Sequence, residues 1–391
     1  MLFLALIYLA FISLGLPDSL LGSSWPLMNV GLGVPVGHAG YISAIISGCT
    51  ILSSLFSHRL IGRFGTGRVT VVSVGLTAVA LMGFSLTPSF GWLLAFAVPL
   101  GLGAGAVDSG LNGFMANHYS IMQMNLLHSF WGVGAMLGPI LVSTLAKAGN
   151  GWRGAYFNIS IVQFALVFLL LFSLPMWRKI EGAAPLLNNV TQENQNKQSL
   201  LAPLQTRGGS IAVLTFFIYA AIESSVMLWG ASYLVNARDI QPQTAAGWIS
   251  LLFVGMTAGR ALGGFVGVKW GNETLIRLGI TLLVAGIILL ALPLPAVFMM
   301  CALFLIGLGM GPIFPSMLHQ TPIYFDTQCA QAAMGMQIAA AYTGTTLMPP
   351  LFGQLFSNIS FSIMPYMFLF LCAGLLFCTA RLSRIGKTSA K

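Results

Sequence analysis

The sequence has 391 residues, of which 57% are hydrophobic and only 6% are charged, and its formal net charge at pH 7 is +9. A soluble domain of ordinary composition has about 25% charged residues, so this composition excludes a soluble enzyme and a disordered chain. The excess of 17 Lys and Arg over 8 Asp and Glu is typical of the cytoplasmic loops of a polytopic membrane protein, and it does not indicate nucleic-acid binding.

Twelve apolar stretches are long enough to cross a bilayer, which requires about 20 predominantly apolar residues. The sequence therefore predicts an all-α membrane protein. The first stretch begins at Leu2 without a charged leader, so no separate signal peptide is expected. In chain order the stretches cover residues 2–28, 39–58, 69–87, 91–116, 124–146, 155–177, 210–235, 243–268, 274–292, 296–318, 328–354 and 360–380.

Basic residues divide unequally between the two sides of these spans. The side that carries both termini holds thirteen lysines and arginines, whereas the opposite loops hold only Lys147, Arg153 and Arg238. The positive-inside rule therefore predicts cytoplasmic termini and a location in the plasma (inner) membrane. The one long loop, residues 178–209, is cytoplasmic in this arrangement. It separates an N-terminal six-helix bundle (1–177) from a C-terminal six-helix bundle with a short tail (210–391).

Short sequences recur between the two halves at nearly equal offsets. GLGAG at 101–105 returns as GLGMG at 307–311, and GRFG at 62–65 returns as VKWG at 268–271, both at an offset of 206. GAMLGP at 134–139 returns as GTTLMP at an offset of 210. Parallel six-helix repeats around a cytoplasmic loop are the architecture of the major facilitator superfamily, which this sequence resembles.

The loop after the second span, GRFGTGR at 62–68, is similar to the Asp-Arg-x-Gly-Arg-Arg signature of that superfamily, with Gly62 in place of the acid. We therefore group Arg63 and Arg68 as gating candidates, together with Arg260 of the eighth span. The alternative is that the positive charges of Arg63 and Arg68 lie in a tight turn and only set the membrane topology. Arg260 is expected to reach the cytoplasmic interface or to pair with backbone and loop groups.

The sequence more specifically resembles the fucose permease branch, whose members are mainly sugar/proton symporters. DSGLN at 108–112 is similar to that branch's acid-Thr-x-x-Asn element, and NLLHSF at 125–130 is similar to its Asn-Leu-x-Gln-x-Phe element, with His128 in place of Gln. Asp18 lies about where the branch has an acid. The resemblance implies sugar transport coupled to protons.

Four ionisable side chains lie at membrane depth, namely Asp18, Asp108, Glu223 and Arg260. Such groups are costly in hydrocarbon and persist chiefly where they face a cavity or a partner. Desolvation opposes a net charge of minus two, so at least one acid is expected to be protonated part of the time. We predict that the three acids take part in proton coupling. The alternative for each is a carboxyl group that only hydrogen-bonds to a neighbouring helix.

Polar and aromatic residues inside the spans are the candidate substrate contacts. Aromatic rings can stack on a sugar ring, and amides can bind its hydroxyl groups. The alternative for the aromatic residues is packing in the core or at the membrane interface. The alternative for the amides is a hydrogen bond between helices. The alternative for the histidine is a packed or hydrogen-bonded ring. The candidates are Asn112, Asn125, His128, Gln163, Tyr219, Trp229 and Gln337.

These features predict a secondary transporter, not an enzyme, which takes up a monosaccharide or related small polar solute with protons by alternating access. Its expected partners are the solute and the lipid bilayer, and the family implies a monomer. No cofactor, metal ion or nucleic acid is expected, since the proton is the coupling ion. The alternatives are a non-transporting membrane sensor and a drug/proton antiporter, because residues 134–139 partly match the antiporter motif of the fifth span.

Overall fold

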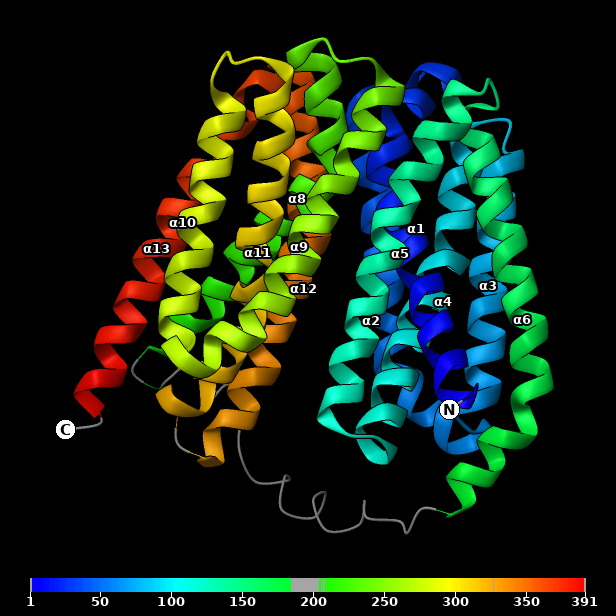
Figure 1. Ribbon diagram of the computed structural model, residues 1–391, viewed down its shortest axis with the longest axis horizontal. Coiled ribbons are helices and arrows are strands. Elements are labelled where there is room, and N and C mark those ends of the chain that lie inside the picture. The colour runs from blue at the N-terminus through cyan, green and yellow to red at the C-terminus, as the bar shows by residue number, and fades with distance from the viewer. Residues whose placement is uncertain (1, 184–203, 205, 207, 326, 390–391) are drawn as a thin grey trace. The chain divides into compact units, whose positions relative to one another are not determined.

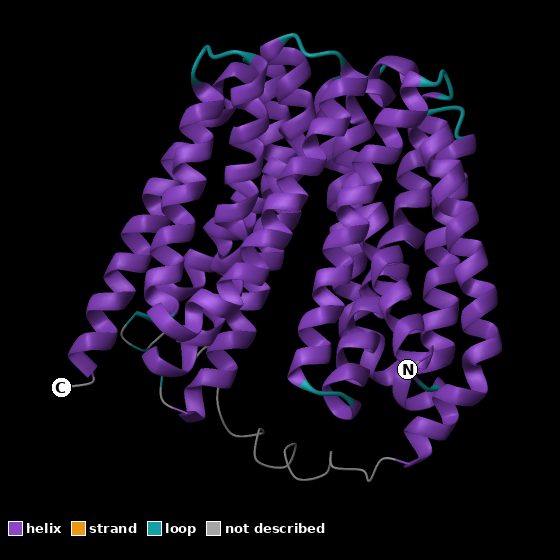
Figure 2. Ribbon diagram, viewed as in Figure 1, coloured by secondary structure: helices purple, strands orange, loops and turns teal. Residues whose placement is uncertain are grey.

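The computed structural model describes residues 2–183, 204, 206, 208–325 and 327–389 (Figure 1). Within these residues the chain forms twelve long α-helices and short 3-10 helices, and it has no strand (Figure 2). Eleven of these helices are long and apolar enough to cross a membrane. The exception among the described helices is α12, whose first eleven residues include three glutamines. The predicted all-α membrane fold is confirmed.

The helices belong to two compact units, which we describe separately. The first unit comprises Met1–Pro185, Met227–Ser250 and Pro349–Asn358, and the second comprises Leu186–Val226, Leu251–Met348 and Ile359–Lys391. The helices of the first half are α1 (Leu2–Leu32), α2 (Ala39–Phe64), α3 (Thr66–Leu86), α4 (Phe90–His118), α5 (Ile121–Lys147) and α6 (Gly151–Ala183). Those of the second half are α8 (Gly209–Arg238), α9 (Pro242–Trp270), α10 (Asn272–Ala291), α11 (Ala296–Tyr324), α12 (Thr327–Asn358) and α13 (Met364–Ser389).

Several helices extend beyond the apolar stretches that predicted them. The second stretch ends at residue 58, where basic residues begin, but α2 continues to Phe64. The helix ends where Gly65 takes φ +81° and ψ 154°, and Gly271 takes φ +77° and ψ 159° between α9 and α10. These two glycines are 206 residues apart, so the recurring sequence marks the same turn in both halves.

Glycines of the recurring GLGAG sequence set the packing of α4. A methyl group on Gly101 would overlap the carbonyl oxygen of Ile46 in α2, and one on Gly105 would overlap that of Thr50. Gly103 points to the other side, where a methyl group would overlap the backbone of α3 at Ser73. The outer two glycines therefore bring α4 against α2, and the middle one brings it against α3.

The second half repeats this arrangement in α11. Gly307 and Gly311 lie against the backbone of α9, where added methyl groups would overlap Leu252 and Met256. Gly309 lies against α10 at Gly279. One five-residue sequence thus produces the same three-helix packing in each half.

The first unit also contains the ends of three helices from the second half of the chain. The Nε2 atom of Gln354 in α12 donates to the hydroxyl group of Tyr41 in α2 over 3.0 Å. Gly40 lies against the backbone of Pro350, and Gly22 of α1 lies against the α8 backbone at residues 227 and 228. Close contacts therefore join the end of α8 to α1 and the end of α12 to α2.

Candidate functional site

Asp18 of α1 is held by a tryptophan from α5. The indole Nε1 of Trp131 donates to Asp18 Oδ2 over 2.8 Å. The two helices cross closely at Gly15, which lies against the Trp131 carbonyl, and at Gly134, which lies against the Ile12 carbonyl. This glycine crossing brings the indole next to the carboxyl group of Asp18, a residue that is exposed on α1.

Asp108 of α4 forms a polar pair with Asn112 one turn further along the same helix. The Nδ2 atom of Asn112 donates to Asp108 Oδ1 over 2.9 Å. Asn112 Oδ1 is buried and has no hydrogen-bond partner among the described residues. Asp18 and Asp108 lie on α1 and α4, two helices of the first unit that contact each other. Two of the three predicted acids therefore belong to the first unit.

Glu223 of α8 lies in the second unit, in a cluster with two other helices. The Tyr219 hydroxyl group is 3.0 Å from Glu223 Oε1 and 2.9 Å from the carbonyl oxygen of Met310 in α11. Arg260 Nη2 of α9 lies 3.8 Å from the same Oε1 atom, and the side chains of Arg260 and Glu223 are 34% and 22% exposed. The guanidinium group of Arg260 thus has an acidic neighbour within the membrane span, a partner that the sequence did not predict.

Three predicted substrate contacts are buried and join helices. Gln163, 1% exposed, donates from Nε2 to the Ser13 carbonyl over 2.5 Å, and Gln337 accepts from Thr321 over 2.8 Å. Trp229 is fully buried, and its Nε1 donates to the Pro349 carbonyl over 2.9 Å. For Gln163 and Trp229 the structure favours the packing alternative, whereas Gln337 also lines a cavity among α8, α10, α11, α12 and α13.

The remaining predicted contact residues lie on α5. His128 is exposed on this helix, and its ring meets the Phe11 ring of α1 edge-on, with centroids 5.8 Å apart. The side chain of Asn125 lies outside the described part of the chain. The structure places His128 on the helix that carries Trp131, one turn before it.

The signature sequence spans the turn at Gly65, with Arg63 in the last turn of α2 and Arg68 in the first turn of α3. Arg63 and Arg68 are both exposed, and the Arg63 guanidinium carbon lies 5.4 Å from the centre of the Phe64 ring. Gly67 lies directly against the buried ring of Trp177 in α6. The signature sequence is therefore anchored to α6 by packing, while its two arginines project from the described structure.

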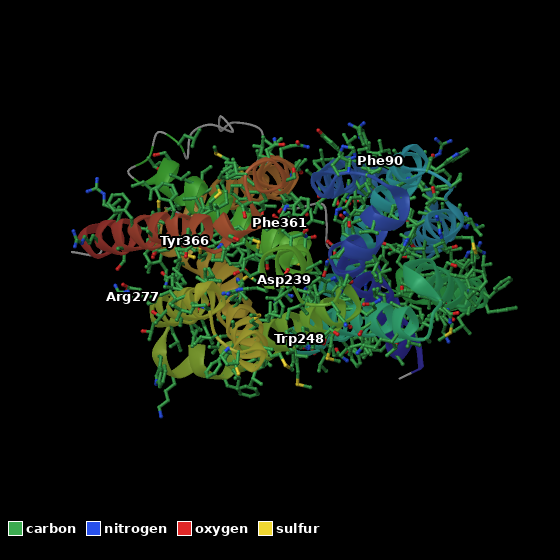
Figure 3. All side chains as sticks on the ribbon, turned by 90° about the horizontal axis from the view of Figure 1, so that it is seen from above. Phe90, Asp239, Trp248, Arg277, Phe361 and Tyr366 are labelled. Atoms are coloured by element: carbon green, nitrogen blue, oxygen red, sulfur yellow. The ribbon has the colours of Figure 1, made fainter. Side chains whose placement is uncertain are left out.

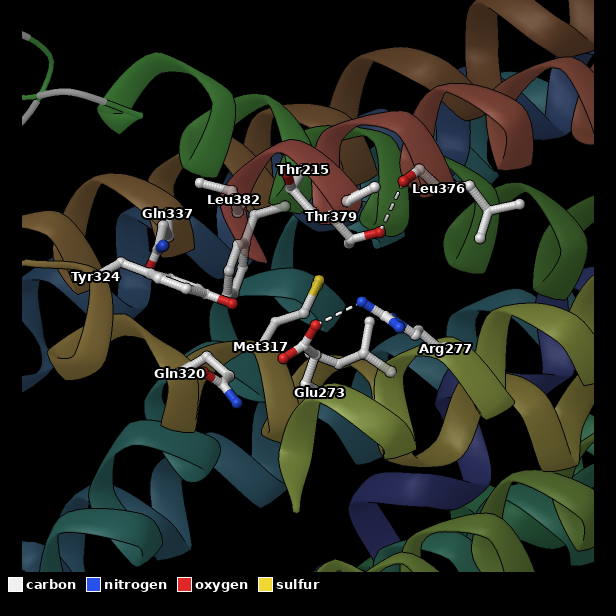
Figure 4. Close-up of a pocket in the computed structure, with 13 residues that line it drawn as sticks. Thr215, Glu273, Arg277, Met317, Gln320, Tyr324, Gln337, Leu376, Thr379 and Leu382 are labelled. Carbon is white, nitrogen blue, oxygen red and sulfur yellow. Dashed lines mark hydrogen bonds and ion pairs between the residues drawn. The ribbon is translucent and has the colours of Figure 1, made fainter. Parts of the chain in front are cut away.

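A cavity of about 150 Å³ lies within the second unit, among α8, α10, α11, α12 and α13 (Figure 4). Glu273 forms an ion pair with Arg277 (2.5 Å) and accepts a hydrogen bond from Ser383. Arg277 lies at the outer edge of the helices in Figure 3 and is 61% exposed. Gln320 and Tyr324 also line the cavity. This cluster was not predicted from the sequence, although Glu273 and Arg277 have the spacing of a helical ion pair.

Trp131 and Tyr219 each form a hydrogen bond with one of the predicted acids. Tyr219 was predicted as a substrate contact, but it is 1% exposed and bonds to Glu223 and Met310. Trp131 was not predicted, because its partner Asp18 is 113 residues away. Only the crossing of α1 and α5 reveals that pairing.

Comparisons with known proteins agree with this architecture. The sequence profile of the Major Facilitator Superfamily matches residues 7–336. The glucose/mannose transporter GlcP of Bacillus subtilis is 23% identical over 297 residues, 75% of this chain and 73% of that protein. The cis,cis-muconate transport protein of Acinetobacter baylyi is 24% identical over 255 residues, 60% of this chain and 58% of that protein.

A crystal structure of a mutant of the nucleoside transporter NupG shares the fold. It superimposes with a TM-score of 0.76 at 13% sequence identity, covering 97% of this chain and 98% of that one. At this identity the likeness concerns the fold alone.

Proposed function

Because the chain belongs to the major facilitator superfamily of membrane transporters, we propose that it moves a monosaccharide or related small polar solute together with protons by alternating access. One observation carries the proposal. Three carboxyl groups lie within membrane-spanning helices, and each is held by a hydrogen-bonding neighbour. The neighbour is Trp131 for Asp18, Asn112 for Asp108 and Tyr219 for Glu223.

These surroundings support both protonation states of a carboxyl group. The low-dielectric membrane disfavours the charged form, whereas an N–H donor or a nearby guanidinium group favours it. Asp18 has the indole N–H of Trp131, and Glu223 has Arg260 at 3.8 Å. Opposing influences of this kind allow a carboxyl group to gain and lose a proton as its access to water changes.

A neutral polar solute fits the first unit better than an anion does. Asp18 and Asp108 both lie in the first unit, and in their ionised forms they would repel an anionic solute. The indole ring of Trp131 beside the Asp18 carboxyl group supplies an aromatic surface next to a hydrogen-bond acceptor, a combination that suits a sugar. The similarity to a glucose/mannose transporter supports the same class.

Uptake by proteoliposomes tests the proposal. Purified protein is reconstituted, and a panel of labelled hexoses, pentoses and polyols is supplied with and without an inward proton gradient. The matched variants are Asp108→Asn, within the membrane, and Asp239→Asn, in the connection between α8 and α9. We expect gradient-driven accumulation of one sugar, lost in Asp108→Asn but kept in Asp239→Asn, with counterflow exchange surviving in both.

Drug/proton antiport is the outcome that would replace this proposal. The glycines of residues 134–139 lie in helix packing, Gly134 against Ile12 and Gly138 against Ser19 of α1, so the structure adds no support for a separate antiporter role. If no neutral sugar accumulates and an outward flux of a lipophilic cation appears, the symporter proposal is wrong.

A further inference from the structure

Tyr219 has one hydroxyl hydrogen and two oxygen neighbours. Its oxygen lies 3.0 Å from Glu223 Oε1 and 2.9 Å from the Met310 carbonyl oxygen. A carbonyl oxygen can only accept, and so can an ionised carboxylate, whereas a protonated carboxyl group can also donate. Both contacts are therefore full hydrogen bonds only when Glu223 is protonated, donates to the Tyr219 oxygen, and leaves the Tyr219 hydrogen for Met310.

We propose that Tyr219 is a positioning residue that links the protonation of Glu223 to the attachment of α8 to α11. With Glu223 protonated, hydrogen bonds run from Glu223 to Tyr219 and on to Met310. With Glu223 ionised, Tyr219 turns its hydrogen to the carboxylate, and the Met310 carbonyl loses its donor from α8. This inference rests on the proposed proton coupling.

The proton balance of this switch is simple. The hydrogen of Tyr219 stays on its oxygen and only rotates about the C–O bond. The proton that leaves Glu223 passes to water, because the Glu223 side chain is 22% exposed. Among the described residues, the groups whose charge or hydrogen bond acts on Glu223 are Arg260 of α9 and Tyr219 of α8.

The surroundings of Tyr219 make the loss of its contact with α11 consequential. Tyr219 is 1% exposed, so water does not readily replace its hydrogen bond to Met310. Without that bond the Met310 carbonyl keeps only its helical partner, the backbone N–H of Phe314. Its ring also packs on Phe314 of α11, with centroids 6.0 Å apart. This packing keeps the ring in place while the hydroxyl hydrogen changes partner.

The segment of α11 that Tyr219 contacts is already weakened. Pro312 and Pro315 lie within this helix, just after Met310. Each proline lacks the backbone N–H that would bond to the preceding turn. The missing bonds belong to the carbonyls of Leu308 and Gly311, which lie on either side of Met310. The bond from Tyr219 therefore attaches α8 to a part of α11 with fewer helical hydrogen bonds, and its loss would favour bending of α11 at this point.

Infrared difference spectroscopy during a pH titration tests the switch without any transported solute. The purified protein in lipid is titrated, and the protonated-carboxyl band and the tyrosine C–O–H bands are followed together. We expect a tyrosine band to shift with the same midpoint as the carboxyl band of Glu223. Both changes should disappear in Glu223→Gln, whose amide group donates permanently to Tyr219.

Two hydroxyl deletions complete the experiment. Tyr219→Phe should lose the titrating tyrosine band and keep the carboxyl band. The matched control is Tyr156→Phe, which removes another buried hydroxyl group, one that contacts Ser24, and it should keep both bands. The proposal is overturned if Glu223 titrates without a tyrosine change, if that change persists in Glu223→Gln, or if Glu223 holds one protonation state throughout the pH range of the folded protein.

The transport proposal and this switch can fail separately. If the two bands titrate together but no solute is driven by a proton gradient, the proposed function is wrong and the switch stands. If gradient-driven uptake is found but the tyrosine band does not titrate, uptake does not use this link.

Discussion

Trp131 is positioned by glycines rather than by neighbours in sequence. Gly15 and Gly134 allow the backbones of α1 and α5 to approach closely, and the indole N–H then reaches Asp18 at 2.8 Å. A hydrogen bond to a charged acceptor contributes about 1.5–3 kcal/mol. The balance between the charged and neutral forms of Asp18 therefore depends on a residue in another helix.

Replacing Trp131 with phenylalanine should weaken proton-driven uptake. The substitution removes the N–H donor and keeps an aromatic ring. Losing about 1.4 kcal/mol of stabilisation corresponds to about a tenfold lower rate. We expect about a tenfold lower initial rate of gradient-driven uptake in proteoliposomes. Trp92→Phe on α4, where the native side chain is 53% exposed, is the control and should transport normally. Wild-type uptake by Trp131→Phe would show that this hydrogen bond is dispensable.

The acids of the site could be predicted from the sequence, but their partners could not. An ionisable residue within a long apolar stretch is conspicuous without any structure, as Asp18, Asp108 and Glu223 were. The pairing of Asp18 with Trp131 spans 113 positions, and that of Tyr219 with Met310 spans 91. Such pairings depend on how helices cross, which apolar periodicity does not encode.

Helix packing explains why GLGAG and GLGMG recur. In each half the first and last glycines face one neighbouring helix and the middle glycine faces another. In a membrane, small residues allow backbones to approach closely, and van der Waals packing then stabilises the pair. The sequence suggested close helix approach at these glycines, but it could not assign each glycine to its neighbour.

Leucine at an outer glycine of either repeat should destabilise the protein. Gly105→Leu would push α4 away from α2, and Gly307→Leu would push α11 away from α9. Overpacking of this kind typically costs about 1–3 kcal/mol. We expect lower unfolding temperatures in detergent for both variants.

The control for these variants lies on the same helix. Among the described residues, no atom outside the neighbouring backbone of α4 lies within 4 Å of the position that a methyl group on Gly113 would take. Gly113→Leu should therefore change the free energy of unfolding by about 0.5 kcal/mol or less. Equal destabilisation at Gly105 and Gly113 would contradict the packing explanation.

At the scale of the whole molecule, the ends of α8, α9 and α12 share a compact unit with the first six helices. Gln354 bonds to Tyr41 there, and Pro350 lies against Gly40. Alternating access by the proposed mechanism requires these contacts to separate during each cycle, because they join segments from the two halves of the sequence.

Bridging this contact should stop transport. Tyr41→Cys and Gln354→Cys are combined in a background whose five native cysteines are replaced by alanine, and a short bifunctional thiol reagent is added. We expect uptake to fall to background and to recover when a cleavable bridge is reduced, whereas each single-cysteine protein should transport normally with the same reagent. Full uptake by the bridged protein would show that the contact does not open.

The distribution of basic residues also predicts the orientation of the chain. Green fluorescent protein fused to the C-terminus should fluoresce, because that end is expected to be cytoplasmic. Alkaline phosphatase fused at the same end should be inactive, and phosphatase inserted after Asp239, between α8 and α9, should be active. The reverse pattern would invert the orientation.

Proton movement started by the solute itself is the most direct test of coupled uptake. Proteoliposomes containing a pH-sensitive dye are prepared without a gradient, and the transported sugar is added outside. We expect the interior to acidify with wild-type and Asp239→Asn protein but not with Asp108→Asn protein. Uptake without any pH change, or alkalinisation of the interior, would contradict proton symport.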